Sequence, residues 1–216
     1  MTSRVQHVVE WPKANSVKAQ MMKFVRSKIA VLALVASAVP ALAGDIRNCT
    51  WCHGESAQGY EPAPRLAGQR PRYIENQLLS FRTHTRDNPF SRQYMWGAAA
   101  NLNSQTEHYL AIYFSRLSPK AASDGDKQRA ATGRALYNDG NPDANTVACA
   151  VCHGPNAQGI RDIPRLGGLS YYYLKRKLAE WGEGYHAAAK SPMPQVARKL
   201  SPNQIEALAS YLSFVK

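Results

Sequence analysis

The pentapeptide Cys49-Thr50-Trp51-Cys52-His53 recurs one hundred residues later as Cys149-Ala150-Val151-Cys152-His153. Both copies have the pattern C-x-x-C-H, and together they use all four cysteines of the 216-residue chain. The match continues without a gap, since C-H-G-E-S-A-Q-G-Y-E-P-A-P-R-L-A-G at residues 52–68 aligns with C-H-G-P-N-A-Q-G-I-R-D-I-P-R-L-G-G at residues 152–168. The chain therefore contains an internal repeat.

C-x-x-C-H is the pattern at which a c-type haem is attached. Two thiols at this spacing add to the vinyl groups of one porphyrin, and the histidine that follows ligates the iron from the same side. We therefore expect two covalently bound haem c groups. The expected attachment residues are Cys49, Cys52, Cys149 and Cys152, and the expected iron ligands are His53 and His153.

Three alternatives exist for these cysteines. Four thiolates can hold structural zinc, but zinc does not require a histidine directly after each pair. A thioredoxin-like pair follows a strand in a βαβ unit, and no convincing strand precedes either pair. Disulfides would leave both histidines unexplained. Haem attachment accounts for all of these residues.

The N-terminal part of the chain resembles an export signal. Within residues 22–43, a basic stretch precedes a short apolar run at residues 29–39, and Ala41-Leu42-Ala43 forms an A-x-A cleavage site. We interpret residues 1–43 as a leader, with the mature chain beginning at Gly44. Residues 1–21 lack this pattern, and translation from Met21 or Met22 would leave them out.

Export and haem attachment support each other, because haem is attached to C-x-x-C-H outside the cytoplasm in bacteria. The expected location is therefore the periplasm. The alternative is a leader retained as a membrane anchor, although its apolar run is short for a transmembrane span. Membrane association stays open at this point.

The charge balance changes once the leader is set aside. The whole chain has 27 basic and 15 acidic residues, and residues 44–216 have 21 and 14. No basic stretch is interleaved with stacking aromatic residues, so nucleic-acid binding is not expected. The run Lys175-Arg176-Lys177 fits either the steering of an acidic redox partner or an ordinary solvated helix face.

Apolar residues at helical spacing follow each C-x-x-C-H pattern. Ile74, Leu78 and Phe81 lie at i, i+4 and i+7, and Leu174, Leu178 and Trp181 repeat this spacing. A helix at each repeat's end is predicted from Leu110, Tyr113, Phe114 and Leu117, and from Leu208, Tyr211, Leu212 and Val215. The sequence thus predicts two copies of one all-α unit.

Capping boxes are expected to begin these last helices. The candidates are Ser104-Gln105-Thr106-Glu107 and Ser201-Pro202-Asn203-Gln204, the second with proline at its first helical position. Residues 118–126 contain Pro, Ala, Ser, Gly and charged residues, which indicates a linker. The predicted organisation is a first domain at residues 44–117, a linker at 118–126 and a second domain at 127–216.

Met95 and Met193 are the only methionines of the predicted mature chain, one in each repeat. Each lies about forty residues after its C-x-x-C-H histidine and seven before a leucine. A lone methionine is usually a packing residue, but this repetition favours thioether ligation of iron. Histidine and methionine together leave iron no vacant position and raise its reduction potential, which suits electron transfer rather than catalysis.

The segment P-R-L provides candidate residues around the haem. Pro64 and Pro164 each lie eleven residues after their histidine, and their carbonyl groups are expected to accept a hydrogen bond from the ring Nδ1–H. Arg65 and Arg165 are expected either to pair with a haem propionate or to be solvated.

C-x-x-C-H, P-R-L-x-G, a later methionine and a capped terminal helix resemble the layout of class I cytochromes c. Two such units, with L-A-G-Q-R-P-R-Y-I-E-N-Q-L in the first, are similar to the dihaem cytochrome c4 family over nearly all of residues 45–216. The resemblance implies tandem domains, each wrapped around one covalent haem, with the haems near one another. It also implies His53, Met95, His153 and Met193 as axial ligands.

One feature departs from the resemblance. Class I domains begin with a helix whose Gly-x-x-x-aromatic face crosses the terminal helix, and Gly133 to Tyr137 provide it in the second unit. In the first unit only residues 44–48 precede Cys49 in the mature chain, which is too short for this helix. The face of the helix at residues 110–117 is then expected to be exposed, packed on the second domain or docked to another protein.

Three functions follow from this sequence. The leading one is a periplasmic, non-enzymatic dihaem carrier of single electrons between redox proteins, plausibly to a terminal oxidase. The alternative is a cytochrome subunit of a periplasmic dehydrogenase. In either case the redox partner can be bound to the membrane. A dihaem peroxidase, which would act on a small-molecule substrate, requires an open or labile iron. His84, His108 and His186 are its spare histidines, and they are not equivalent in the repeat.

Overall fold

The computed structural model describes residues 45–186 and 191–216, and the predicted leader at residues 1–43 lies outside these ranges. The described residues form helices, turns and loops. Within them, the sole β-type pairing is an isolated antiparallel bridge between Asn141 and Thr146. The predicted all-α class is confirmed.

The first repeat is built around two helices, α2 (Pro71–Arg82) and α4 (Ser104–Arg116), which pack against each other. Proline at the first position of α2 has the backbone angle that a helix start requires. The predicted stripe of Ile74, Leu78 and Phe81 is buried along α2. Between these helices lie a π-helical turn, η1 (Ser91–Met95), and a short helix, α3 (Trp96–Ala99).

The predicted capping box of α4 is wrong. Asn103 caps the helix instead, and its side chain accepts a hydrogen bond from Thr106 N at 2.9 Å. The extended backbone of Asn103 places its amide oxygen over the first turn, so Ser104 is already helical. Glu107 is freed from a capping role, and it is buried beside Arg82, with 2.9 Å between Oε1 and Nε.

The second repeat is more completely helical at its start. It comprises α5 (Lys127–Asp139), a short 3₁₀ turn η2 (Pro142–Ala144), α6 (Ala150–His153), α7 (Tyr171–Glu183), α8 (Met193–Ala197) and α9 (Pro202–Phe214). The predicted capping box of α9 is confirmed, since Ser201 and Gln204 bond reciprocally to each other's backbone N–H.

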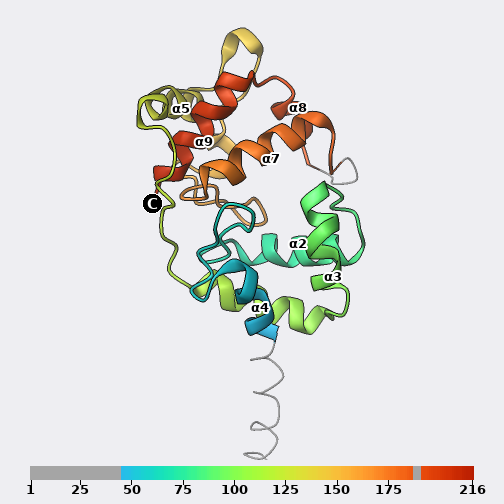
Figure 1. The fold of residues 1–216 in the computed structure, drawn as a ribbon. Helices are drawn as coiled ribbons and strands as arrows, with labels where there is room; N and C mark the ends of the chain where they lie inside the picture. Colours follow the sequence, from blue (N-terminus) through green and yellow to red (C-terminus); the bar gives the residue numbers. More distant parts are fainter. Residues whose placement is uncertain (1–44, 187–190) are drawn as a thin grey trace, which may run out of the picture. The chain divides into compact units, whose positions relative to one another are not determined.

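Helices α5 and α9 cross at close range (Figure 1). The crossing depends on Gly133, because a Cβ atom there would lie 2.0 Å from the carbonyl oxygen of Ala207. One turn later on α5, Tyr137 is fully buried, and its hydroxyl donates to the carbonyl of Gly154 at 2.5 Å. The first helix of this repeat is thus tied to the turn that follows C-x-x-C-H.

The start of the first repeat differs from this arrangement. Residues 45–53 are helical and include the C-x-x-C-H pattern. That the first domain lacks the separate helix with a Gly-x-x-x-aromatic face stays a prediction. Ile46 packs against the core of this repeat. On α4, Tyr109 and Tyr113 are stacked and partly exposed. They correspond to Ala207 and Tyr211, the residues that meet Gly133 in the second repeat.

Each repeat has its own apolar core. In the first, Leu110, Ala111 and Phe114 of α4 meet Ile74 and Leu78 of α2. In the second, the core contains Tyr137, Leu169, Tyr173, Leu174, Leu208, Ala209 and Leu212. Residues 45–216 nevertheless form one compact unit, and the predicted boundaries at 117 and 127 stay a prediction.

The predicted linker is held along its length. Ala122 N donates to the carbonyl of Gly168 at 3.1 Å, and Ser123 N donates to that of Ser213 at 3.0 Å. Lys120 N donates to Gln58 Oε1 of the first repeat at 2.9 Å. This segment therefore contacts both repeats. Across residues 45–186 and 191–216, no helix has the length and apolar character that crossing a membrane requires.

We expect Gly133→Ala to lower the free energy of unfolding of the haem-loaded protein by about 1–3 kcal/mol, the usual cost of overpacking. The added methyl group collides with the backbone of α9, which has no flexible side chain to move aside. Gly182→Ala in α7 is the matched control, because its nearest neighbour would lie 3.6 Å away. The control should be neutral or stabilising by up to about 1 kcal/mol. Equal losses in denaturant titrations of both variants would contradict this account.

Candidate haem-binding sites

His53 and His153 occupy equivalent positions at the ends of two helical segments, residues 45–53 and α6. Both side chains are 6% exposed. Nδ1 of His53 lies 2.7 Å from the carbonyl oxygen of Pro64, and Nδ1 of His153 lies 3.0 Å from that of Pro164. The two carbonyl groups are the ones that the sequence predicts to accept these hydrogen bonds.

A repeated turn brings each proline to its histidine. Gly59 N donates to the carbonyl of His53 at 2.8 Å, and Gly159 N donates to that of His153 at 2.9 Å. Both glycines have positive φ, and a Cβ atom at either would lie 2.4–2.5 Å from the backbone around the proline. The A-Q-G stretch thus lets residues 63–65 and 163–165 pass close to the histidine turn.

These contacts set the tautomer of each imidazole. A carbonyl oxygen only accepts, so Nδ1 must carry the proton and donate it, which leaves the Nε2 lone pair available to a metal. Burial lowers the pKa of both His53 and His153, and Arg86 lowers that of His53 further. Each ring is therefore held as the neutral donor that iron requires, and the residues present fit a haem iron ligated at Nε2.

No disulfide joins the four cysteines in the described residues. Cys49 and Cys149 are partly buried, whereas Cys52 and Cys152 are exposed. Among the described residues, no three His, Cys, Asp or Glu side chains gather closely enough to hold a metal ion. Each thiol pair lies with its own histidine in one helical turn, the arrangement that haem attachment requires.

Met95 and Met193 lie in short helical pieces that differ between the repeats. Met95 ends the π-helical turn η1, a form that often marks functional sites. Met193 begins α8 directly after Pro192. Both residues are partly buried. Their pairing with His53 and His153 as axial ligands stays a prediction.

Arg65 and Arg165 have different surroundings although their sequence contexts match. Arg65 is 5% exposed, and it donates to the carbonyl groups of Ala67, Lys120, Gly167 and Gly168. These contacts use four of its five N–H donors. The side chain of Arg165 donates to Gly167 O at 3.3 Å. One N–H donor of Arg65 therefore remains for the predicted contact with a haem propionate.

The spare histidines are in three different settings. His84 is exposed and stacked on Trp96, with ring centroids 3.9 Å apart. His108 is exposed and pairs with Glu75, with 2.5 Å between Nδ1 and Oε1. His186 is buried, and its Nε2 lies 2.5 Å from Lys177 Nζ. Their surroundings confirm that they are not equivalent in the repeat.

A buried polar cluster joins the loop after α2 to helix α7, and the sequence interpretation missed it. Asn88 donates to Glu180 at 3.0 Å, Lys177 donates to Glu180 at 2.6 Å, and His186 N donates to Asp87 at 2.9 Å. Its two parts lie about one hundred residues apart in the sequence, and no motif links them. Burial, with a contribution from Arg86, lowers the pKa of Lys177 to about 7.

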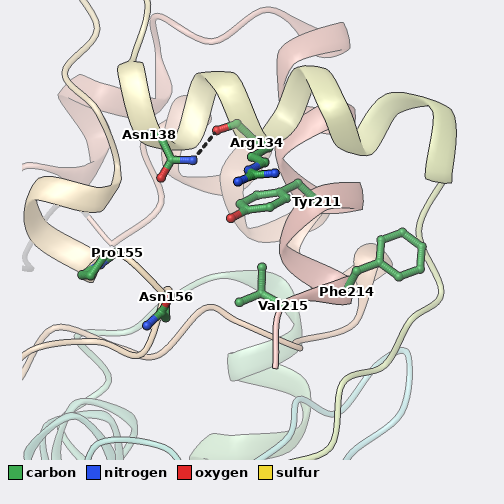
Figure 2. Close-up of a pocket in the computed structure, with 7 residues that line it drawn as sticks. All are labelled: Arg134, Asn138, Pro155, Asn156, Tyr211, Phe214 and Val215. Atoms are coloured by element: carbon green, nitrogen blue, oxygen red, sulfur yellow. Dashed lines mark hydrogen bonds between the residues drawn. The ribbon is translucent and has the colours of Figure 1, made fainter.

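Neither His53 nor His153 lines the hollow drawn in Figure 2. It is lined by Arg134, Asn138, Pro155, Asn156, Tyr211, Phe214 and Val215, where α5 and the end of α9 meet the turn after His153. Asn138 donates to the carbonyl of Arg134 at 3.0 Å. No predicted site residue lines this hollow.

Comparisons with known proteins agree with this geometry. The family model "Cytochrome c" matches residues 130–216. Cytochrome c-552 of Acidithiobacillus ferridurans is 35% identical over 169 residues, which cover 77% of this chain and 73% of that protein. The solved structure of cytochrome c4 from Acidithiobacillus ferrooxidans is 35% identical and superposes with a TM-score of 0.72, covering 77% of this chain and 98% of that one.

This chain belongs to the dihaem cytochrome c4 family. The membership confirms the resemblance, the class I cytochrome c fold and the two covalent haem c groups. It also confirms a role in electron transfer. A further relative, the thiosulfate dehydrogenase electron acceptor of Thiomonas intermedia, is 33% identical over 77% of each chain.

We expect Gly159→Ala to raise the reduction potential of the second haem by roughly 20–60 mV, the worth of one weakened hydrogen bond. The new methyl group displaces the backbone around Pro164, and a histidine that donates a weaker Nδ1–H bond is a less basic ligand of ferric iron. The first haem is the internal control in a spectroelectrochemical titration. Equal shifts at both haems would contradict a local effect.

Proposed function

We propose that this protein is a periplasmic carrier that takes single electrons from one redox protein and delivers them to another, such as a terminal oxidase. In this proposal His53 and Met95 are the axial ligands of the first iron, and His153 and Met193 are those of the second. The observation that carries it is the pair of buried histidines whose Nδ1 atoms are bound by Pro64 and Pro164.

The chain's own residues perform three tasks in this proposal. The cysteines anchor the cofactors, the proline carbonyl groups orient the imidazoles, and the two apolar cores limit access of water. The haem supplies a one-electron couple when bound, and methionine opposite histidine keeps its potential high. Because both axial positions are filled by the protein, we infer that the iron has no catalytic role.

The absorption spectrum of the reduced protein, recorded before and after addition of carbon monoxide, tests this function. We expect sharp c-type bands from two haems and no change with the gas, because both irons are six-coordinate. A shift in part of the spectrum would show an open or labile iron, and the peroxidase alternative would then replace the carrier. A protein without haem bands would contradict both.

Met95→Ala and Met193→Ala test the axial assignment. We expect each substitution to lower the potential of one haem by on the order of 100 mV, since axial-ligand identity sets haem potentials over about 0.8 V. Each should also make that iron bind carbon monoxide. The unsubstituted repeat is the control within the same molecule. Unchanged potentials in both variants would refute methionine ligation.

A cytochrome subunit of a periplasmic dehydrogenase is the second candidate. Two observations favour it: a relative is named for accepting electrons from thiosulfate dehydrogenase, and Tyr109 and Tyr113 of α4 are partly exposed where α9 is covered by α5. Purification from native extracts separates the candidates. A stable stoichiometric complex with a dehydrogenase supports the subunit, and a free dihaem protein supports the carrier.

A further inference from the structure

The two equivalent arginines, Arg65 and Arg165, contribute unequally to the contact between the two repeats. Arg65 of the first repeat donates from Nη1 to the carbonyl of Gly168 at 2.8 Å and from Nη2 to that of Gly167 at 2.6 Å. At the equivalent position, the side chain of Arg165 hydrogen bonds within its own repeat, to Gly167. Two residues with the same local sequence, P-R-L, thus have different roles.

Gln69 adds to the same side of the contact. Its Oε1 accepts from Arg165 N at 2.7 Å, and its Nε2 donates to Arg165 O at 3.0 Å. One side-chain amide therefore satisfies both backbone groups of a residue in the other repeat. The equivalent residue, Leu169, is 4% exposed and belongs to the apolar core of the second repeat.

The surroundings of Arg65 are shaped to receive its guanidinium. Gly168 has a φ of +75°, and a Cβ atom there would lie 2.5 Å from Arg65 Nη1. The same side chain donates to Lys120 O in the linker at 2.6 Å and to Ala67 O at 3.1 Å. Arg65 thus ties the first repeat, the linker and the second repeat together through four carbonyl groups.

These bonds are strong enough to hold an interface. Hydrogen bonds from a charged donor are shorter and stronger than neutral ones, and Arg65 is 5% exposed, so water competes little for its donors. A planar guanidinium presents its donors in a fixed fork, and it therefore fixes direction as well as distance. The Asn88–Glu180 hydrogen bond, at 3.0 Å, gives a second attachment elsewhere between the repeats. Two separated attachments restrict rotation of one repeat on the other.

We propose that Arg65, assisted by Gln69, is a positioning residue that fixes the second repeat against the first and thereby sets the distance and orientation across which an electron passes between the two haem sites. This inference rests on the proposed function in one respect, that both sites carry redox-active iron. Arg65 touches no reacting atom in this role. Its effect is on geometry, and Arg165 does not share it.

Three variants of the haem-loaded protein test the proposal: Arg65→Gln, Arg65→Lys and the control Arg165→Gln. The first measurement is native-state amide exchange at Arg165 and Ala122, whose N–H groups bond to Gln69 and Gly168. We expect at least roughly 100-fold faster exchange in Arg65→Gln, in line with the loss of two charge-assisted hydrogen bonds between the repeats. The amides of Gly59 and Gly159 report on the haem turns and should not change.

The second measurement is the rate at which electrons redistribute between the haems after pulsed reduction. We expect this rate to fall roughly tenfold or more in Arg65→Gln, because small displacements of reacting centres are costly, and to be unchanged in Arg165→Gln. Arg65→Lys should be as slow as Arg65→Gln, since an ammonium group cannot span the carbonyl groups that a guanidinium fork reaches. The absorption spectrum of each haem should stay the same in all three variants.

Each other result would overturn the proposal. An unchanged redistribution rate in Arg65→Gln refutes the positioning role, and an equal fall in Arg165→Gln refutes its one-sidedness. An unchanged redistribution rate in Arg65→Lys would mean that the positive charge of residue 65 matters and the geometry of its donors does not. Should Arg65→Gln fail to fold, Gln69→Leu carries the test, because it gives the first repeat the residue of the second, and it should speed exchange at Arg165. Failure of the proposed function has a separate signature, the absence of two reducible haems in the unsubstituted protein.

Discussion

The hydrogen bond between a histidine Nδ1 and a proline carbonyl is the constraint on which each half of this molecule depends. It fixes the imidazole tautomer and aims Nε2, and it requires residues 64 and 164 to return to the turn that they left eleven residues earlier. Gly59 and Gly159 allow that return because a side chain at either would collide with the backbone around the proline. Ala57 and Ala157 are fully buried beneath the loop, and each carbonyl accepts two backbone N–H groups. A short, local set of contacts therefore orients each histidine without any long-range packing.

That locality explains what the sequence predicted. The C-x-x-C-H turns, the proline acceptors and the buried stripe of α2 depend on residues within about thirty positions of one another. The sequence pattern was therefore sufficient to predict them. The cap of α4 could not be predicted in this way, because Ser104 and Asn103 are both good caps and the choice depends on where the chain leaves α3. The role of Arg65 was also beyond the pattern, since its acceptors at Gly167 and Gly168 lie more than one hundred residues away. Sequence reasoning failed where identical local motifs meet different tertiary partners.

The terminal helices make the same point at the level of packing. Helix α9 has Ala207 where α5 approaches, and the absence of a side chain at Gly133 lets the two backbones meet. Helix α4 has Tyr109 at the corresponding place, which is too large for that crossing, and residues 45–53 approach the core through Ile46 instead. The residues of α9 and of α4 thus match the different segments that pack near them, α5 for α9 and residues 45–53 for α4. On α4 the larger aromatic side chains Tyr109 and Tyr113 are partly exposed.

Both haem sites are built from the same repeated segment, residues 52–68 and 152–168. Differences between the two sites are therefore sought in residues outside that segment. The register of one hundred pairs Gln77 with Lys177, Ser80 with Glu180 and Arg86 with His186, and all three substitutions change charge or basicity. One of these differences reaches a haem-site histidine. Burial lowers the pKa of both His53 and His153, each opposed by the hydrogen bond to its proline carbonyl, and the charge of Arg86 lowers the pKa of His53 further. Burial lowers the pKa of Lys177, which donates a hydrogen bond to Glu180. The repeat therefore gives two haem sites with the same local geometry, and the charge of Arg86 distinguishes the surroundings of the first from those of the second.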